Sequence, residues 1–227
     1  MRANDPNLPH LRLIADALGE LREHLVFLGG AVAGLLITDP LADSVRATRD
    51  VDAVIAAELT AYYRFETALA ARGFRRDTQG DVICRWVHEA SGLLFDLMPV
   101  QADVLGFSNR WYPYAMETAV PVTLDDGLTI RRVSAVAFVA TKLEAFASRG
   151  AGDFLSSHDL EDVLNIIDGR EELAAEMSAA PAALQQSIAA AFAQLLTKSD
   201  FLNALPGLIT EPERASVILA RLQTMSA

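Results

Sequence analysis

The stretch RATRDVDAVI, residues 46–55, carries two aspartates, Asp50 and Asp52, that lead into an apolar segment. We expect residues 50–55 to form a strand, and side chains two positions apart on a strand point to the same face. Because two neighbouring carboxylates repel each other, a protein tolerates such a pair best when a cation lies between them. Carboxylate oxygens favour Mg²⁺ or Mn²⁺, so the stretch predicts a divalent metal site. A solvated turn is the alternative interpretation of an Asp-x-Asp pattern.

A glycine-rich turn precedes this stretch. Gly29 and Gly30 follow the apolar residues 25–28 and open the apolar residues 31–37. This pattern is typical of a strand that passes through a hinge into a helix. Backbone amides in such a turn can approach phosphate oxygens, and the start of a helix favours negative charge. The turn therefore predicts phosphate binding at Gly29 and Gly30, with a hinge that binds no ligand as the alternative.

A third carboxylate is available later in the chain. Asp96 is the only charged residue in the apolar residues 91–100. A carboxylate inside an apolar strand is costly unless it reaches solvent or a cation. Residues 58–72 have the length of a helix, and residues 74–76 and 82–87 have the pattern of strands, so we expect Asp96 on a strand close to Asp52. Asp96 is then a candidate third metal ligand, and a capping or rim aspartate is the alternative.

The chain resembles the nucleotidyltransferase superfamily that has the polymerase-beta-type fold. The resemblance lies in the order of three features: the glycine pair, the pattern Arg46-x-Thr48-x-Asp50-x-Asp52 and the lone strand aspartate. The closest resemblance is to the AbiEii/AbiGii-type nucleotidyltransferases, the toxins of certain bacterial abortive-infection and toxin-antitoxin pairs. The resemblance covers roughly residues 25–170. Many members of the superfamily have a serine where this chain has Ala31, so phosphate contacts would depend on backbone amides, Arg46, Thr48 and a later lysine.

That family also has a later helical motif of a lysine, an arginine and two aspartates three positions apart. The matching residues here are Lys142, Arg149, Asp159 and Asp162. Lysine occurs at only two positions in this arginine-rich chain, 142 and 198, and a compact ammonium acts as a point charge on a phosphate. The resemblance implies that Lys142 and Asp159 contribute to nucleotide binding. Charges on exposed helix faces are the alternative, which we favour for Arg149.

The same resemblance implies an activity and its partners. The enzyme would transfer a nucleoside monophosphate from an NTP to a hydroxyl of an RNA end or a protein and release pyrophosphate. Asp50, Asp52 and Asp96 would hold Mg²⁺ or Mn²⁺ as catalytic residues. A neutralising antitoxin protein would be a further partner.

The order of predicted elements indicates an α+β fold, because strand patterns occupy residues up to 133 and helical periodicity follows. We expect residues 1–133 to form the catalytic core, a nucleotidyltransferase-type mixed sheet with flanking helices. Residues 134–227 would form a helical C-terminal bundle that completes the nucleotide site. Residues 8–23 are predicted as a helix, and residues 119–123 and 128–133 as a hairpin around Asp125-Asp126-Gly127. Breaks in the C-terminal helices are predicted near Pro181, Pro206 and Pro212.

Composition limits the class of protein. The chain has 227 residues, 52% of them hydrophobic, and a formal net charge of −11. That charge argues against broad coating of nucleic acid but allows a local basic cleft, near which Trp111, Tyr112 and Tyr114 would stack a base or, as the alternative, pack in the core. The single cysteine, Cys84, agrees with a reducing cytoplasm, and the longest apolar run is too short to cross a membrane.

Two other functions remain open at this stage. One is an antibiotic-modifying nucleotidyltransferase, which would use the same core on a small-molecule hydroxyl. The other is a non-catalytic module that binds nucleotides through the same scaffold, although three intact carboxylates argue against it.

Overall fold

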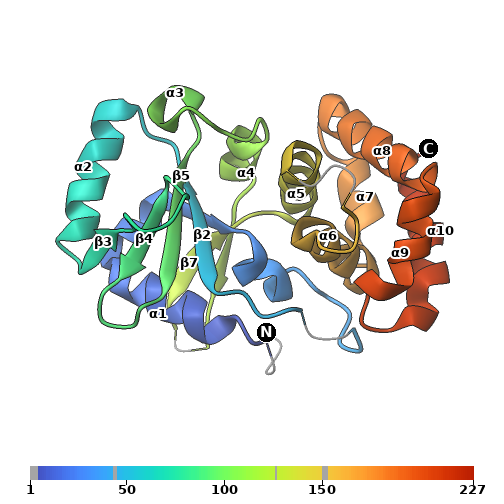
Figure 1. The fold of residues 1–227 in the computed structure, drawn as a ribbon, viewed down its shortest axis with the longest axis horizontal. Helices are drawn as coiled ribbons and strands as arrows, with labels where there is room; N and C mark the ends of the chain where they lie inside the picture. The colour runs from blue at the N-terminus through green and yellow to red at the C-terminus, as the bar shows by residue number, and fades with distance from the viewer. Residues whose placement is uncertain (1–4, 43–44, 126, 150–152) are drawn as a thin grey trace. The chain divides into compact units, whose positions relative to one another are not determined.

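A computed structural model describes residues 5–42, 45–125, 127–149 and 153–227. The chain divides into two compact units (Figure 1). The first consists of residues 1–34 and 46–134, and the second of residues 35–45 and 135–227. Residues 35–45 therefore group with the C-terminal helices, whereas the division drawn from the sequence had placed them in the first domain.

A mixed sheet forms the centre of the first unit. Within the described residues, seven strands lie in the order β3-β4-β5-β2-β1-β7-β6. The pairs β2–β5 and β1–β7 are parallel, and the other neighbouring pairs are antiparallel. This confirms the predicted α+β class and mixed sheet. The strands are β1 Leu25–Leu28, β2 Asp50–Ile55, β3 Phe74–Arg76, β4 Arg85–His88, β5 Leu94–Pro99, β6 Val120–Thr123 and β7 Thr129–Arg132.

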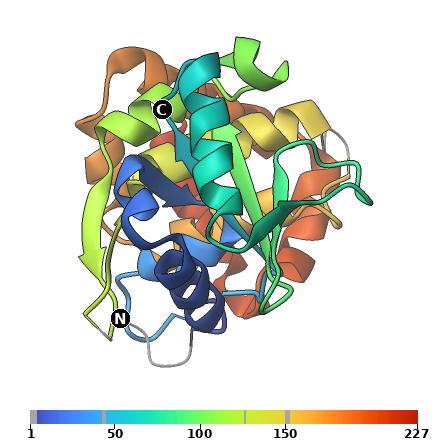
Figure 2. The same ribbon diagram turned by 90° about the vertical axis from the view of Figure 1, so that its left-hand side faces the viewer.

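Helices flank this sheet. All four residues of β1 are buried, and α1 buries Leu11, Ile14 and Leu18. Helix α2 lies over the strands, where the Tyr62 hydroxyl donates a hydrogen bond of 2.8 Å to the carbonyl of Leu97 (Figure 2). The helical elements are α1 Leu8–Leu18, η1 Gly19–His24, η2 Gly30–Leu35, α2 Leu59–Ala70, α3 Ala102–Leu105 and α4 Tyr112–Glu117.

Two predicted elements of the first unit have different limits in the structure. The helix predicted over 8–23 ends as an α-helix at Leu18, where Gly19 has φ +54°, and residues 19–24 continue as the 3-10 helix η1. The strand predicted over 82–87 begins at Arg85, since the Arg85 amide closes a turn onto the carbonyl of Val82.

The aromatic cluster and the predicted hairpin also have defined positions. Tyr112 is buried, and its hydroxyl lies 3.0 Å from the sulfur of Met98, so Tyr112 packs in the core. Strands β6 and β7 form the expected antiparallel pair, with Thr123 opposite Thr129. Asp126 of the predicted turn lies outside the described residues.

The second unit is helical in its described part. Its long first helix, α5, is buried on all sides over residues 135–141 and also buries Leu143 and Phe146. Pro206 lies inside α9, two residues before its end, and does not break it. The elements are α5 Ala135–Arg149, α6 His158–Gly169, α7 Leu173–Ser178, α8 Ala182–Leu196, α9 Ser199–Leu208, η3 Pro212–Arg214 and α10 Ala215–Met225.

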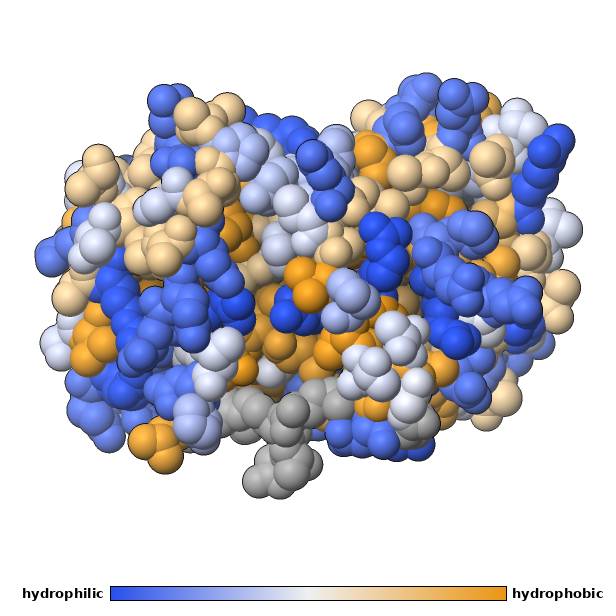
Figure 3. All heavy atoms as spheres, turned by 180° about the vertical axis from the view of Figure 1, so that it is seen from behind, coloured by the Kyte–Doolittle hydropathy of each residue, from blue (hydrophilic) through white to orange (hydrophobic). Residues whose placement is uncertain are grey.

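The helices of the described part of the chain are too short or too polar to cross a membrane. On the face drawn in Figure 3, hydrophilic side chains cover much of the visible surface.

Candidate active site

The three predicted carboxylates lie on one face of the sheet. Strand β2 pairs in parallel with β5, and Asp52 is directly opposite Asp96. Asp50 lies two positions before Asp52 on the same strand and therefore points to the same face. The structure thus places Asp50, Asp52 and Asp96 on one face of two neighbouring strands, and we call these residues the carboxylate row.

Arg85 extends this row across the next strand. Strands β4 and β5 are antiparallel, and Arg85 is the register partner of Asp96. Its Nε donates to Oδ1 of Asp96 at 2.8 Å, and its Nη2 donates to Oδ2 of Asp96 at 2.7 Å. The same Nη2 donates to Oδ2 of Asp50 at 3.0 Å. A guanidinium is therefore the cation between two of the three carboxylates in this structure.

Sequence reasoning did not single out Arg85 as a residue of the site. A signal for its partner was present in the turn that contains Ser91 and Gly92. The β4–β5 register is centred between Ala90 and Ser91, and an antiparallel hairpin pairs residues at equal distances from its centre, which places Arg85 opposite Asp96. This signal does not fix the partner of Arg85 by itself, because the register of a hairpin can shift by one or two residues when its turn length is unknown.

Burial strengthens the electrostatics of this face. The side chains of Asp96 and Arg85 are 8% and 20% exposed. Burial raises the pKa of Asp96, and the hydrogen bonds and charge of Arg85 oppose that rise. Burial, and then the charges of Asp96 and Asp52, raise the pKa of the neighbouring Cys84 thiol to about 12. Burial of Asp96 therefore favours a positive partner on this face, and Arg85 is that partner in this structure.

A buried asparagine organises the approach to the row. Asn7 is fully buried, and its Nδ2 donates to the carbonyls of Arg46 at 2.9 Å and Gly30 at 3.3 Å. Its Oδ1 accepts from the Thr48 amide at 2.8 Å. The Thr48 hydroxyl in turn donates to Oδ1 of Asp50 at 2.6 Å. Asn7 thus joins the glycine turn to the segment that enters β2.

Asn7 had no role in the sequence interpretation. Asn7 directly precedes α1, but its side chain makes no capping bond and contacts residues far away in the sequence. The two backbone segments that it joins meet only in the folded sheet, so no local pattern indicated it.

The glycine turn lies directly beside Asp52. Leu28 is opposite Asp52 in the β1–β2 pair, and the turn begins at the next residue. Gly29 has φ +70°, and a Cβ there would lie 1.9 Å from Oδ2 of Asp52. Gly29 is therefore required both by its backbone and by the close approach of a carboxylate. Gly30 begins the short helix η2.

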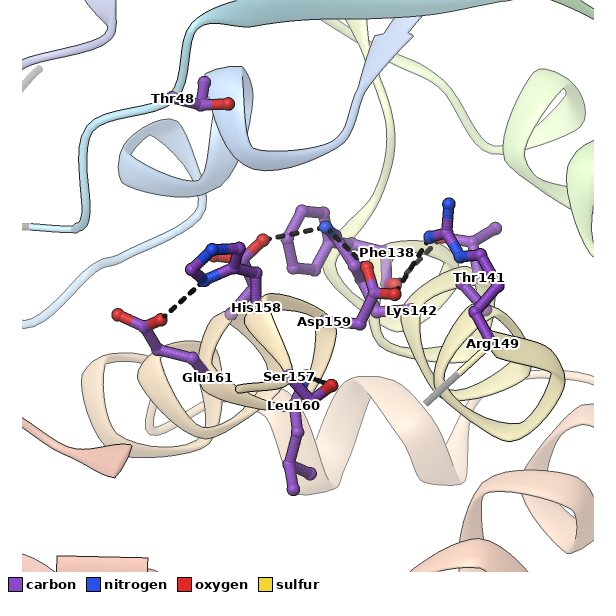
Figure 4. A network of polar contacts seen from close by, with 12 residues as sticks. Thr48, Phe138, Thr141, Lys142, Arg149, Ser157, His158, Asp159, Leu160 and Glu161 are labelled. Atoms are coloured by element: carbon purple, nitrogen blue, oxygen red, sulfur yellow. Dashed lines mark hydrogen bonds and ion pairs between the residues drawn. The ribbon is translucent and has the colours of Figure 1, made fainter. Parts of the chain in front are cut away.

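The second group of predicted residues lies in the helical unit. Nζ of Lys142 on α5 lies 3.0 Å from Oδ1 of Asp159 and 2.7 Å from Oδ2 of Asp162, both on α6 (Figure 4). Asp162 is fully buried, and Arg149 adds a 2.9 Å contact to Asp159. Burial by itself would raise the pKa of Asp159, but Lys142 and Arg149 outweigh it and hold that pKa below its usual value. In this structure the ammonium of Lys142 joins α5 to α6.

A divalent metal fits the donor types of the carboxylate row. Asp50, Asp52 and Asp96 offer only oxygen atoms, which Mg²⁺ and Mn²⁺ prefer, and Asp96 is a buried carboxylate that requires a positive partner. Among the described residues, no three His, Cys, Asp or Glu side chains are arranged closely enough to hold an ion. The carboxylates thus offer the donor atoms that a divalent ion prefers, but they are not arranged around an ion in this structure. Arg85 occupies the position between Asp50 and Asp96.

Comparison with known proteins identifies the fold. No protein-family model and no curated protein matches this chain. Among solved structures, it is similar to the antibiotic-resistance factor ANT(2'')-Ia, with a TM-score of 0.51 and 18% identity over 87% of this chain and 97% of that one. It is also similar to JHP933 from Helicobacter pylori, with a TM-score of 0.49 and 13% identity over 97% of this chain and 91% of that one. A candidate nucleotidyltransferase from H. pylori is similar with a TM-score of 0.45 and 14% identity over 97% of this chain and 94% of that one.

The likeness to ANT(2'')-Ia extends over most of both chains, so this protein has a nucleotidyltransferase-type fold. The narrower resemblance to the AbiEii type stays a prediction.

The close approach of Gly29 to Asp52 can be tested with a matched pair of substitutions. Gly92 has φ +72°, and a Cβ there would meet no atom within 4 Å. Gly29→Ala and Gly92→Ala therefore share the backbone strain, about 1–2 kcal/mol, but only Gly29→Ala displaces Asp52. We expect Gly29→Ala to lower the free energy of unfolding, measured by urea denaturation, by at least about 1 kcal/mol more than Gly92→Ala does. Equal losses would show that the contact with Asp52 is unimportant.

The ion pairs of Lys142 give a second prediction. In Lys142→Met the buried Asp162 loses its ammonium partner, so we expect the free energy of unfolding to fall by about 3–5 kcal/mol. Arg149 is 72% exposed and pairs with Asp159, so Arg149→Met should lower the free energy of unfolding by less than about 1 kcal/mol. Urea denaturation at pH 7 measures both values. A loss below about 1 kcal/mol for Lys142→Met would rule out a structural role.

Proposed function

We propose that this protein is a metal-dependent nucleotidyltransferase. It would transfer a nucleoside monophosphate from an NTP to a hydroxyl group and release pyrophosphate. The observation that supports this most directly is the carboxylate row, which lies beside a glycine turn on one face of a nucleotidyltransferase-type sheet.

The row supplies the chemistry of the proposed reaction. Asp50, Asp52 and Asp96 would hold Mg²⁺ or Mn²⁺, which offsets the charge of the triphosphate and of the leaving pyrophosphate. The acceptor oxygen would form a bond to the α-phosphorus while the bond from that phosphorus to the bridging oxygen of pyrophosphate breaks. Asp96 is the candidate acceptor for the proton of the attacking hydroxyl. Most of the rate enhancement would come from positioning and charge.

Contacts with the nucleotide form a second part of the proposal. Gly29, Gly30, Arg46 and Thr48 surround the start of β2 and are the nearest candidates for phosphate contacts. The hydroxyl of Thr48 already donates to Asp50, so Thr48 also positions that carboxylate. The predicted nucleotide contacts of Lys142 and Asp159 would compete with the ion pairs between them.

Two classes of acceptor follow from different observations. The AbiEii-type resemblance favours the end of an RNA or a protein hydroxyl, with an antitoxin protein as partner. The likeness to ANT(2'')-Ia, named as an antibiotic-resistance factor, favours a hydroxyl on a small molecule. Both acceptors would use the same carboxylate row.

One observation favours a non-catalytic alternative. Arg85 already pairs with both Asp50 and Asp96, so a protein that had lost its metal would still have a cation among these carboxylates. Such a module would bind nucleotides without transferring them.

A transfer assay tests the proposal. We expect wild-type protein with Mg²⁺ or Mn²⁺ to transfer label from an α-labelled NTP, and Asp52→Asn to reduce the rate at least about 100-fold. Asp103→Asn, on the exposed side of α3, is the control and should keep the wild-type rate. Circular dichroism checks that each variant is folded. Undiminished transfer by a folded Asp52→Asn variant would contradict the assignment of the row.

The same assay separates the acceptors. Reactions receive total RNA, a protein extract or a set of small aminated alcohols, and the fraction that becomes labelled identifies the acceptor class. Nucleotide binding by calorimetry with no label in any fraction would support the non-catalytic module.

A further inference from the structure

We propose that Arg85 is an internal counter-ion of the carboxylate row, and that it must leave Asp50 and Asp96 before a divalent ion binds there. The withdrawal of Arg85 would couple metal uptake to the arrival of a phosphate-bearing nucleotide. This inference rests on the proposed function, because it concerns the metal that the reaction needs.

The first step is that Arg85 and a divalent ion need the same atoms. Arg85 occupies both carboxylate oxygens of Asp96 and one oxygen of Asp50. An ion held by these two residues would bond to the same oxygens and would lie within a few ångströms of the guanidinium. Two positive charges that close repel each other strongly on a partly buried surface. Binding of the ion and the bidentate pairing of Arg85 therefore oppose each other.

The second step is that the carboxylates need one of these two cations. The side chain of Asp96 is only 8% exposed, and Asp52 lies directly opposite it in the sheet. Without a positive partner, a buried carboxylate beside two others is costly. Arg85 supplies that partner in the metal-free protein, so the row can fold without metal. Removal of the guanidinium would leave the same oxygens open to an ion.

The third step concerns a destination for Arg85. The residue begins β4, directly after the turn that starts at Val82, and its side chain is 20% exposed. A guanidinium that binds a carboxylate through two parallel hydrogen bonds binds a phosphate with the same geometry. A triphosphate at this face would offer Arg85 a replacement partner and would bring the remaining negative charge that a divalent ion needs. Metal and nucleotide would therefore bind better together than separately.

The test measures binding of Mn²⁺ alone, without nucleotide, by isothermal titration calorimetry on the full chain. We expect Arg85→Gln to bind Mn²⁺ at least about 10-fold more tightly than wild type. Arg75→Gln is the matched control, because Arg75 is an exposed arginine of the same sheet, and its removal changes the net charge equally. Arg75→Gln should change Mn²⁺ affinity less than about 2-fold. Adding Asp96→Asn to Arg85→Gln should abolish the gain.

Two further measurements keep the outcome clear. Arg85→Lys retains a charge but loses the bidentate geometry, so it should show a smaller gain, and it serves if Arg85→Gln does not fold. A non-hydrolysable NTP analogue should increase the Mn²⁺ affinity of wild type by a larger factor than that of Arg85→Gln. Mn²⁺ affinity in Arg85→Gln equal to or weaker than wild type would overturn the inference.

The inference and the proposed function can fail separately. If Asp52→Asn keeps full transfer activity while Arg85→Gln gains Mn²⁺ affinity, the counter-ion role stands and the catalytic assignment falls. If transfer depends on Asp52 but no arginine variant changes Mn²⁺ binding, the enzyme assignment stands and the role of Arg85 is wrong.

Discussion

The site depends on one interaction, the bidentate ion pair between Arg85 and Asp96 across the β4–β5 register. It allows a carboxylate that is 8% exposed to lie in the middle of a sheet, opposite a second aspartate. The cost of burying a charge is met only by a partner of opposite charge at hydrogen-bonding distance. The glycine turn, Thr48 and Asn7 then arrange the remaining carboxylates around this pair.

Much of the fold follows from local rules. The strand over residues 50–55, the paired strands predicted over 119–123 and 128–133, and the helical pattern after residue 134 all appear in the structure close to their predicted limits. The α-helix that begins at Leu8 is shorter than predicted because Gly19 adopts a positive φ. A Cβ at Gly19 would also overlap the guanidinium of Arg72, which comes from a distant segment. Sequence periodicity does not contain that contact, and it does not contain the grouping of residues 35–45 with the C-terminal helices.

The candidate site was predictable to the extent that one strand or one turn defines it. Asp50 and Asp52 share a face through the geometry of a single strand, and Asp96 stood out as the lone charge of an apolar run. Asn7 and Arg85 act through partners that only the folded sheet brings close, so their roles needed the strand register. The glycine turn was expected to approach a phosphate, and the structure adds a reason of its own for Gly29, the carboxylate of Asp52.

The central claim is that the carboxylate row exchanges Arg85 for a divalent ion when nucleotide binds. A crystal structure with Mn²⁺ and a non-hydrolysable NTP analogue, using the anomalous signal of manganese, tests it most directly. The account predicts manganese bonded to oxygens of Asp50 and Asp96, with the Arg85 guanidinium turned away from both carboxylates toward phosphate. Nucleotide bound at this face with Arg85 still paired to Asp96, and with no manganese at the carboxylates, would contradict it.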